Sequence, residues 1–186
     1  MNKNTLLISL LTIVAITGGL FTQQYFHADK VISGYPVLQE TSALSTTTEH
    51  PLTEFTLADL AGKQHNISEW KEKIRILNFW ASWCPPCLKE IPEFIKIQDE
   101  FAEQGIQFIG IAVEDKQSVA EYIKSNPVNY PILIAGDAGI TLSRQLGNAV
   151  NTVPFTLIVN RNNQIIYRQA GEISRAKMLE LIKAIL

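Results

Sequence analysis

The apolar residues of this 186-residue chain follow two patterns. The chain begins with one long uncharged stretch, and after Pro51 short apolar runs alternate with longer segments of helical spacing. The runs Ile74–Trp80 and Ile106–Val113 are near-continuous, which is typical of central strands covered on both faces. Between them, Pro85 to about Gln104 is typical of a long helix that Gly105 ends. The alternation predicts an α/β domain whose sheet is covered by helices on both sides.

Shorter elements complete a predicted order of βαβαβαββα. Strand-like pieces at Glu54–Leu57 and Gln64–Ile67 surround the turn 61–63, and Ser68 opens one helical turn. The later elements are a helix at Lys116–Ser125, a strand at Ile132–Ile134, a helix at Ile140–Leu146, strands at Phe155–Asn160 and Gln164–Arg168, and a last helix at Arg175–Ile185. Asn162 and Asn163 join the two late strands as a hairpin because Asn tolerates positive φ, and Ser174 caps the last helix.

The N-terminal stretch predicts a membrane-targeting segment. No Asp, Glu, Lys or Arg occurs from Asn4 to Ala28, and Leu6–Ile16 is strongly apolar. Its length lies between a signal-peptide core and a spanning helix. Lys3 precedes it, so we expect the N-terminus in the cytoplasm and the following domain outside. Because no A-x-A site follows, residues 1–28 are predicted to be an uncleaved signal anchor; a cleaved signal peptide and a buried helix are the alternatives.

Residues 29–50 predict a flexible tether. The segment from Asp29 to about Leu52 is rich in Ser and Thr and contains turn-forming Gly and Pro in SGYP. Its apolar residues follow no regular periodicity. The alternative is an N-terminal extension that packs on the domain. The domain itself is predicted to span residues 51–186. No cysteine lies near the N-terminus, which excludes a lipid anchor of the lipoprotein type.

Composition excludes several classes of function. The 16 basic and 18 acidic residues give a net charge of −2, whereas a nucleic-acid binder needs a clustered basic excess. Structural zinc sites are usually closed by four Cys or His ligands, and this chain has two cysteines. Its histidines, His27, His50 and His65, lie upstream of both cysteines without paired spacing. We therefore predict no metal site and no nucleic-acid partner.

The two cysteines stand in the motif Trp83-Cys84-Pro85-Pro86-Cys87, directly after a central strand and at the start of the long helix. A C-x-x-C in that setting predicts a redox site. Cys84 takes the N-cap position, where the helix dipole and free N–H groups favour a thiolate. Cys87 lies one turn further and can resolve a mixed disulfide. A structural disulfide or half of a zinc site is the alternative.

The two prolines of the motif predict the direction of the chemistry. Pro85 suits the first helical turn, where its missing N–H would be unpaired anyway. Pro86 also lacks an N–H, so Cys87 supplies the nearest donor to the Cys84 sulfur. Fewer donors stabilise the thiolate less, which favours donation of electrons. We expect a reduction potential nearer ~−270 mV than ~−120 mV.

The sequence WCPPC after ILNFWAS, with Pro92 five residues past Cys87, resembles the thioredoxin superfamily. The pattern is most similar to the membrane-anchored TlpA/ResA/CcmG-type thiol–disulfide oxidoreductases of bacteria. The resemblance covers about Pro51 to Leu186, including EFTLADLAGKQHNISEW and TVPFTLIVNRNNQIIYRQAG. It implies a thioredoxin-like α/β fold: a central mixed β-sheet flanked by helices, with an N-terminal strand extension and a central βα insertion.

The resemblance also implies roles for individual residues. Cys84 resembles the exposed nucleophile and Cys87 the buried resolving thiol. Pro154 resembles the cis-proline opposite the active site, with the Val153 backbone placed beside Cys84 to pair with an extended substrate. Glu90, three residues past Cys87, resembles an acidic residue near the cysteines of ResA-type proteins.

The spacing of Glu90 from Cys87 also indicates a role for this residue. It shares a helix face with Cys87 and could accept that thiol's proton if burial raises its pKa; the alternative is a solvated helix residue. Asn78 stands where thioredoxins carry a buried Asp, and an amide cannot act as a base, so Glu90 is the better proton carrier. Glu114 is expected to be an ordinary loop acid, with a place in an acidic pocket near the motif as the alternative.

The aromatic and proline residues around the motif predict packing and a substrate rim. Trp80 is expected to pack in the core, while Trp83, with Pro85 and Pro86, is expected on the rim that substrates touch. Pro92 is expected to kink the helix. Phe155 follows Pro154, whereas the resemblance implies a Pro-Glu-Thr pattern at this place in CcmG-type proteins. This difference weakens the case for a role in cytochrome maturation.

Together these features predict an extracytoplasmic disulfide reductase that acts on exported proteins without a bound cofactor. The resemblance implies apocytochrome c as one substrate class and a membrane thiol reductant of the CcdA/DsbD type as electron donor. The protein is expected to be anchored to the bacterial cytoplasmic membrane and to face the periplasm or outside, or to be soluble in the periplasm after cleavage. The alternatives are a dithiol oxidase or isomerase, a thiol peroxidase, for which no Pro-x-x-x-Thr/Ser-x-x-Cys pattern leads into Cys84, and a non-catalytic binding module.

Overall fold

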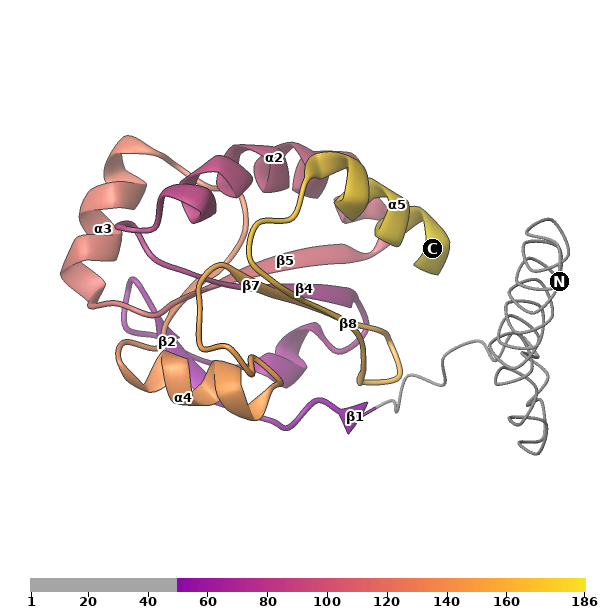
Figure 1. Ribbon diagram of the computed structural model, residues 1–186, viewed down its shortest axis with the longest axis horizontal. Helices are drawn as coiled ribbons and strands as arrows, with labels where there is room; N and C mark the ends of the chain where they lie inside the picture. Colours follow the sequence, from indigo (N-terminus) through magenta and orange to yellow (C-terminus); the bar gives the residue numbers. More distant parts are fainter. Residues whose placement is uncertain (1–49) are drawn as a thin grey trace, which may run out of the picture. The chain divides into compact units, whose positions relative to one another are not determined.

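The computed structural model describes residues 50–186. The predictions of an anchor at residues 1–28 and a tether at residues 29–50 lie outside the described residues, except that His50 belongs to the first strand of the domain. The described part is built on one eight-stranded sheet in the order β1-β8-β7-β4-β5-β6-β2-β3 (Figure 1). The strands are β1 (His50–Pro51), β2 (Thr56–Asp59), β3 (Gln64–Asn66), β4 (Ile74–Trp80), β5 (Ile106–Ala112), β6 (Ile132–Ile134), β7 (Phe155–Val159) and β8 (Gln164–Ala170).

The sheet is mixed, as predicted. The buried strand β4 pairs in parallel with β5, and β5 pairs in parallel with β6. On its other side β4 pairs antiparallel with β7, which continues into β8 through the hairpin at Asn163 (φ 62°). Every residue of β4 and β5 is buried, which explains why both strands appear in the sequence as near-continuous apolar runs.

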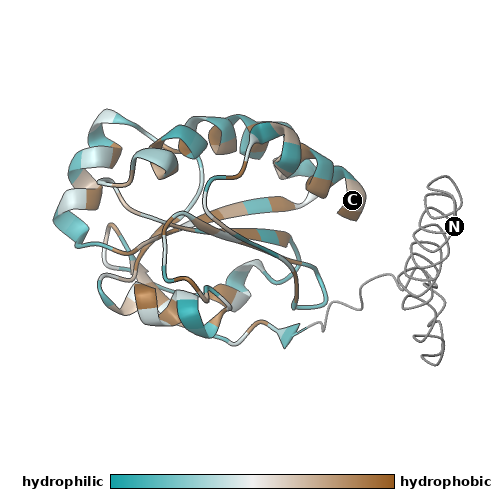
Figure 2. Ribbon diagram, in the orientation of Figure 1, coloured by the Kyte–Doolittle hydropathy of each residue, from teal (hydrophilic) through white to brown (hydrophobic). Residues whose placement is uncertain are grey.

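Helices cover both faces of the sheet (Figure 1). They are α2 (Pro85–Phe101), α3 (Lys116–Ser125), α4 (Ala138–Gln145) and α5 (Arg175–Ile185), with short 3-10 turns η2 (Ile67–Trp70) and η3 (Ala102–Gln104). α2 and α5 pack over one face, and α4 and η2 lie over the other. Figure 2 shows the hydrophobic residues concentrated on the strands and the hydrophilic ones on the outer turns of the helices.

The segments that precede β4 occupy both edges of the sheet. The hairpin of β2 and β3 joins the sheet through β6, where Ala58 pairs with Ile134. β1 pairs with β8 at the opposite edge, and Leu52 after it is buried. This is the N-terminal strand extension that the resemblance implies. β6 and α4 lie between α3 and β7 in the chain, at the place of the expected βα insertion.

Predicted boundaries differ from the structure mainly near short polar segments. β2 lies two residues later than predicted because Asp59 Oδ1 accepts from the N–H groups of Ala61 and Lys63 and so extends the hairpin to the turn. The turn η2 begins one residue before Ser68, capped by Asn66, whose side chain accepts the Ser68 N–H at 2.8 Å. α4 begins at Ala138, two residues before the predicted start.

Candidate active site

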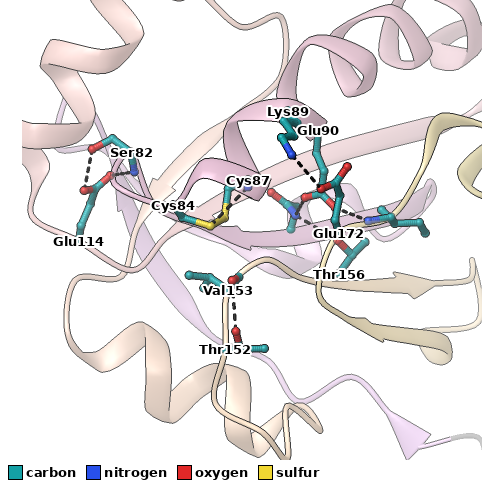
Figure 3. The surroundings of a disulfide bond; sticks show 12 residues. Ser82, Cys84, Cys87, Lys89, Glu90, Glu114, Thr152, Val153, Thr156 and Glu172 are labelled. Atoms are coloured by element: carbon teal, nitrogen blue, oxygen red, sulfur yellow. Dashed lines mark hydrogen bonds and ion pairs between the residues drawn. A yellow bond between two sulfur atoms is a disulfide. The ribbon is translucent and has the colours of Figure 1, made fainter.

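The cysteine motif lies where β4 ends and α2 begins. Cys84 is the N-cap of α2, with extended backbone angles (φ −100°, ψ 99°), and its sulfur accepts the Cys87 N–H at 3.4 Å. Cys84 and Cys87 are joined by a disulfide, with Cα atoms 5.3 Å apart (Figure 3). The predicted N-cap position of Cys84 and the predicted donor are therefore confirmed.

The surface over the disulfide is made by its sequence neighbours. Cys87 is fully buried, as the resemblance implies. Cys84 is not the exposed thiol that the resemblance implies, since it keeps only 3% of its surface exposed, and the pair lies just beneath the surface in this oxidised form. Trp83 is 64% exposed and Pro85 is exposed, whereas Pro86 is half-buried. Trp80 is buried against Tyr122, with ring centroids 5.4 Å apart, which confirms that it packs in the core.

Sheet register brings the loop before β7 to the same edge. Phe155 pairs with Phe79 near the end of β4, so the residues just before Phe155 lie beside the loop that carries the motif. The Val153–Pro154 peptide bond is cis, as the resemblance implies. Pro154 is buried and Val153 is half-buried. Figure 3 draws Val153 and Thr152 in the surroundings of the disulfide.

Glu90 is buried on α2, one turn past Cys87, with 2% of its surface exposed. Its Oε1 accepts the backbone N–H of Ile173 at 2.6 Å, and its Oε2 accepts from the Asn78 side chain at 3.3 Å. Burial raises the pKa of Glu90 to about 7, although both hydrogen bonds lower it; the charge of Glu172 raises it further. The alternative of a solvated helix residue is therefore wrong, and the condition set for a proton acceptor is met.

Asn78 and Thr156 lie directly opposite each other on β4 and β7. Asn78 Nδ2 donates to Thr156 Oγ1 at 3.0 Å as well as to Glu90, and Thr156 is fully buried. At the position where the resemblance implies a buried aspartate in thioredoxins, this chain therefore has an amide that donates to the Glu90 carboxyl.

Glu114 is not the ordinary loop acid that we expected. It follows β5, whose carboxyl end lies beside that of the parallel strand β4. With only 7% of its surface exposed, it accepts the Ser82 N–H at 2.6 Å and the Ser82 hydroxyl at 2.9 Å (Figure 3). The carboxylate therefore fixes the backbone two residues before Cys84.

The sequence did not predict three of the hydrogen-bond partners at this site, Ser82, Thr156 and Ile173. Ser82 could have been found, because parallel strands bring their carboxyl ends, and hence Ser82 and Glu114, to one edge of the sheet. Thr156 could have been found once β7 was paired with β4 in register. Ile173 gives no signal, since only the backbone N–H acts and it lies 83 residues from Glu90 in the chain.

The described residues offer neither a metal site nor a membrane span. Between residues 50 and 186, no three His, Cys, Asp or Glu side chains gather where they could hold a metal ion. Within the same range, none of the helices combines the length and the apolar character that crossing a membrane requires.

Comparison with known proteins places this chain in a family. The Redoxin family model matches residues 47–183. A protein of Halalkalibacterium halodurans named thiol-disulfide oxidoreductase ResA is 27% identical over 180 residues, covering 95% of this chain and 93% of its own. The ResA protein of Bacillus subtilis is 31% identical over 134 residues, covering 70% of this chain and 72% of its own.

Solved structures agree with the sequence relatives. A thiol:disulfide interchange protein of the thioredoxin family from Chlorobium tepidum superposes with a TM-score of 0.66 at 28% identity, covering 74% of this chain and 96% of that one. StoA from Bacillus subtilis superposes with a TM-score of 0.58 at 25% identity, covering 70% and 96%. The fold is thioredoxin-like, and the chain belongs to the Redoxin family as a thiol–disulfide oxidoreductase related to ResA.

Proposed function

We propose that this oxidoreductase is an extracytoplasmic disulfide reductase of exported proteins that works through Cys84 and Cys87. The observation that carries the proposal is the donor count at the Cys84 sulfur. Among the residues that the structure describes, the Cys84 sulfur accepts one hydrogen bond, from the Cys87 N–H, because the two intervening prolines have no N–H. A thiolate with few donors is a better electron donor, since its reduced form is less stabilised.

In the first step, the Cys84 thiolate attacks one sulfur of the target disulfide. A mixed disulfide forms between Cys84 and the target, and the other target sulfur leaves as a thiolate. The N-terminal end of α2 favours the attacking anion through its dipole and the Cys87 N–H.

In the second step, Cys87 resolves the mixed disulfide. Its proton passes to the Glu90 carboxylate, and the Cys87 thiolate attacks the Cys84 sulfur. The intramolecular disulfide forms and the second target thiolate is released, so the target gains two electrons and the protein loses two. A carboxyl with a pKa of about 7 is suited to this exchange near neutral pH.

The target would lie across the exposed rim over the disulfide. Trp83, Pro85 and Pro86 supply its apolar surface, and the Val153 backbone beside Pro154 supplies groups that can pair with an extended peptide. Apocytochrome c is one substrate class consistent with the resemblance to ResA-type proteins.

We further propose an N-terminal membrane anchor at residues 1–28 and a tether at residues 29–50, carrying the domain of residues 51–186 on the outer side of the cytoplasmic membrane. A membrane thiol reductant would then restore the dithiol by donating two electrons and two protons. The cysteine pair is the only redox centre that this cycle uses.

Insulin reduction by the full-length chain, with a chemical thiol as electron donor, tests the proposed reaction. Replacing Cys84 with Ala should abolish turnover, because no nucleophile remains. The equilibrium potential of the pair should lie near ~−270 mV, and a value above about −180 mV would contradict a reductase. Full function of Cys84→Ala in the host would instead establish a non-catalytic binding module.

A further inference from the structure

Near the disulfide, hydrogen bonds through Asn78 join three buried polar side chains from three elements (Figure 3). Glu90 comes from α2, Asn78 from β4 and Thr156 from β7, and none is more than 3% exposed. The Asn78 Nδ2 group donates one hydrogen to Glu90 Oε2 at 3.3 Å and one to Thr156 Oγ1 at 3.0 Å. In this arrangement the amide donates through both of its N–H groups. It therefore suits the ionised form of Glu90, whose oxygens can only accept.

The two oxygens of Glu90 are not equivalent. Oε1 accepts the Ile173 backbone N–H at 2.6 Å, and a backbone amide can only donate. A carbonyl oxygen is a better acceptor than a hydroxyl oxygen, so the short bond from Ile173 favours Oε1 as the carbonyl oxygen and places a proton taken up by Glu90 on Oε2, which faces Asn78. An O–H on Oε2 that points to Asn78 meets an N–H of the amide in its present orientation, with no acceptor between them.

A half-turn of the Asn78 amide removes this conflict. Its carbonyl oxygen has two lone pairs and nearly the shape of the NH2 group that it would replace. After the turn, Oδ1 can accept from the protonated Glu90 and from the Thr156 hydroxyl, which can donate as readily as it accepts. The cluster keeps the same number of hydrogen bonds in both states of Glu90.

We propose that Asn78 is a positioning residue whose side-chain amide turns over with the proton on Glu90, with the Thr156 hydroxyl as its second partner. This inference rests on the proposed function of Glu90 as the acceptor of the Cys87 proton. When the proton leaves Cys87 for Glu90 Oε2, the amide turns its carbonyl to that proton. When the proton passes on to the departing target thiolate, the amide turns back.

The surroundings leave this role to Asn78. Of the titratable groups that act on Glu90 from neighbouring elements, Glu172 lies in the loop before α5 and Tyr130 lies just before β6. Glu172 is paired at the surface with Lys89 on α2, and Cys87 stands one turn before Glu90. The hydrogen bonds to the Glu90 carboxyl come from Asn78 and Ile173 alone in the part of the chain that the structure describes. Of these two groups only the amide can change from donor to acceptor.

Nuclear magnetic resonance of the full-length oxidised chain tests the inference, because the disulfide keeps both thiols from titrating. The Asn78 side-chain NH2 signals should move with pH, with the same midpoint as the Glu90 carboxyl carbon. Contacts between the Asn78 NH2 protons and Thr156 should be present at high pH and lost at low pH. In Glu90→Gln, the Asn78 signals should stay constant. Asn78 signals that do not move while Glu90 titrates would overturn the inference, as would movement that persists in Glu90→Gln.

Asn78→Leu links the amide to the reaction. Without the amide, the charged form of Glu90 loses a charge-assisted donor and the protonated form loses a neutral acceptor. The charge-assisted bond is the stronger of the two, so the Glu90 midpoint should rise by less than about one pH unit. The midpoint of the pH profile for target release from a Cys84 mixed disulfide should move to higher pH by the same amount. An unchanged midpoint would overturn the inference. If Asn78 turns over in the wild-type chain but Glu90→Gln resolves mixed disulfides at the full rate, the inference stands and the proposed role of Glu90 fails.

Discussion

Two buried carboxylates flank the cysteine motif, and their partners give them different properties. Glu90 has one backbone N–H and one amide N–H for its two oxygens, in surroundings that disfavour its charge. Glu114 receives the N–H and the hydroxyl of Ser82. The first carboxyl is suited to exchanging a proton and the second to fixing the loop before Cys84.

Glu90 should make stability depend on pH. Its pKa is about 7 in the folded chain against an ordinary value of 4.5, so the folded state binds more protons between these values. The free energy of unfolding should therefore fall as pH rises from about 4.5 to 7 and then level off. Glu90→Gln should remove this component, as urea unfolding of the oxidised protein at a series of pH values would measure. A wild-type slope that survives in Glu90→Gln would contradict the assignment.

Replacing Glu114 with Ala should loosen the motif loop. The variant leaves the Ser82 N–H and hydroxyl without their acceptor, which should lower the free energy of unfolding by about 2 kcal/mol. Ser82→Ala is the matched control, since it removes only the hydroxyl bond and should have about half the effect. Urea unfolding measures both, and equal stability of Glu114→Ala and the wild type would show that the two bonds contribute nothing.

In the proposed reaction, the start of α2 is the element that sets the redox chemistry. Cys84 caps the helix, prolines fill its first two positions, and Cys87 supplies the hydrogen bond to the Cys84 sulfur. Each of these features is local, so the element could be predicted from a few adjacent residues.

Pro86→Ala should make the pair more oxidising. The substitution restores an N–H at the second helical position, where a donor can reach the N-cap side chain. A better stabilised Cys84 thiolate should raise the reduction potential by roughly 10–30 mV, as equilibration with glutathione would measure. Pro85→Ala is the matched control, because an N–H at the first helical position does not point at the cap. A shift that is the same in both variants would contradict the role assigned to the donor count.

The same distinction between local and distant causes explains what could be predicted. The bounds of β4, α3, β6 and α5 follow from apolar runs and caps close in the sequence, and the predicted bounds match the structure. The burial of Glu114 and the Ile173 contact of Glu90 depend on which strand and helix ends meet in space. No periodicity within either segment carries that information.

At the scale of the whole molecule, the chain before β4 closes the sheet at both edges, through β1 on β8 and through the β2–β3 hairpin on β6. A charged cluster holds that hairpin to η2. His65 contacts Glu69 Oε2 through Nδ1 at 2.8 Å and Asp59 Oδ2 through Nε2 at 3.3 Å, and it stacks on Trp70. Only a protonated ring can donate to both carboxylates.

His65 should therefore stabilise the folded chain at low pH. The hydrogen bond to Glu69 and then that to Asp59 raise its pKa above the ordinary 6.5. This stabilisation is fully present below pH 6.5 and is lost as pH rises through the folded-state pKa. In a Glu90→Gln background, which removes the other titration, His65→Gln should flatten the fall in unfolding free energy above pH 6.5. An unaltered fall would show that another group titrates there.

Trapping of mixed disulfides tests the proposed roles of the two cysteines most directly. Full-length Cys87→Ala, expressed in the host and isolated under acid quenching, should carry exported proteins bound through Cys84, and mass spectrometry of the adducts would identify them. Cys84→Ala should carry none, because the nucleophile is missing. Adducts on Cys84→Ala, with none on Cys87→Ala, would contradict the assignment of Cys84 as the attacking thiol.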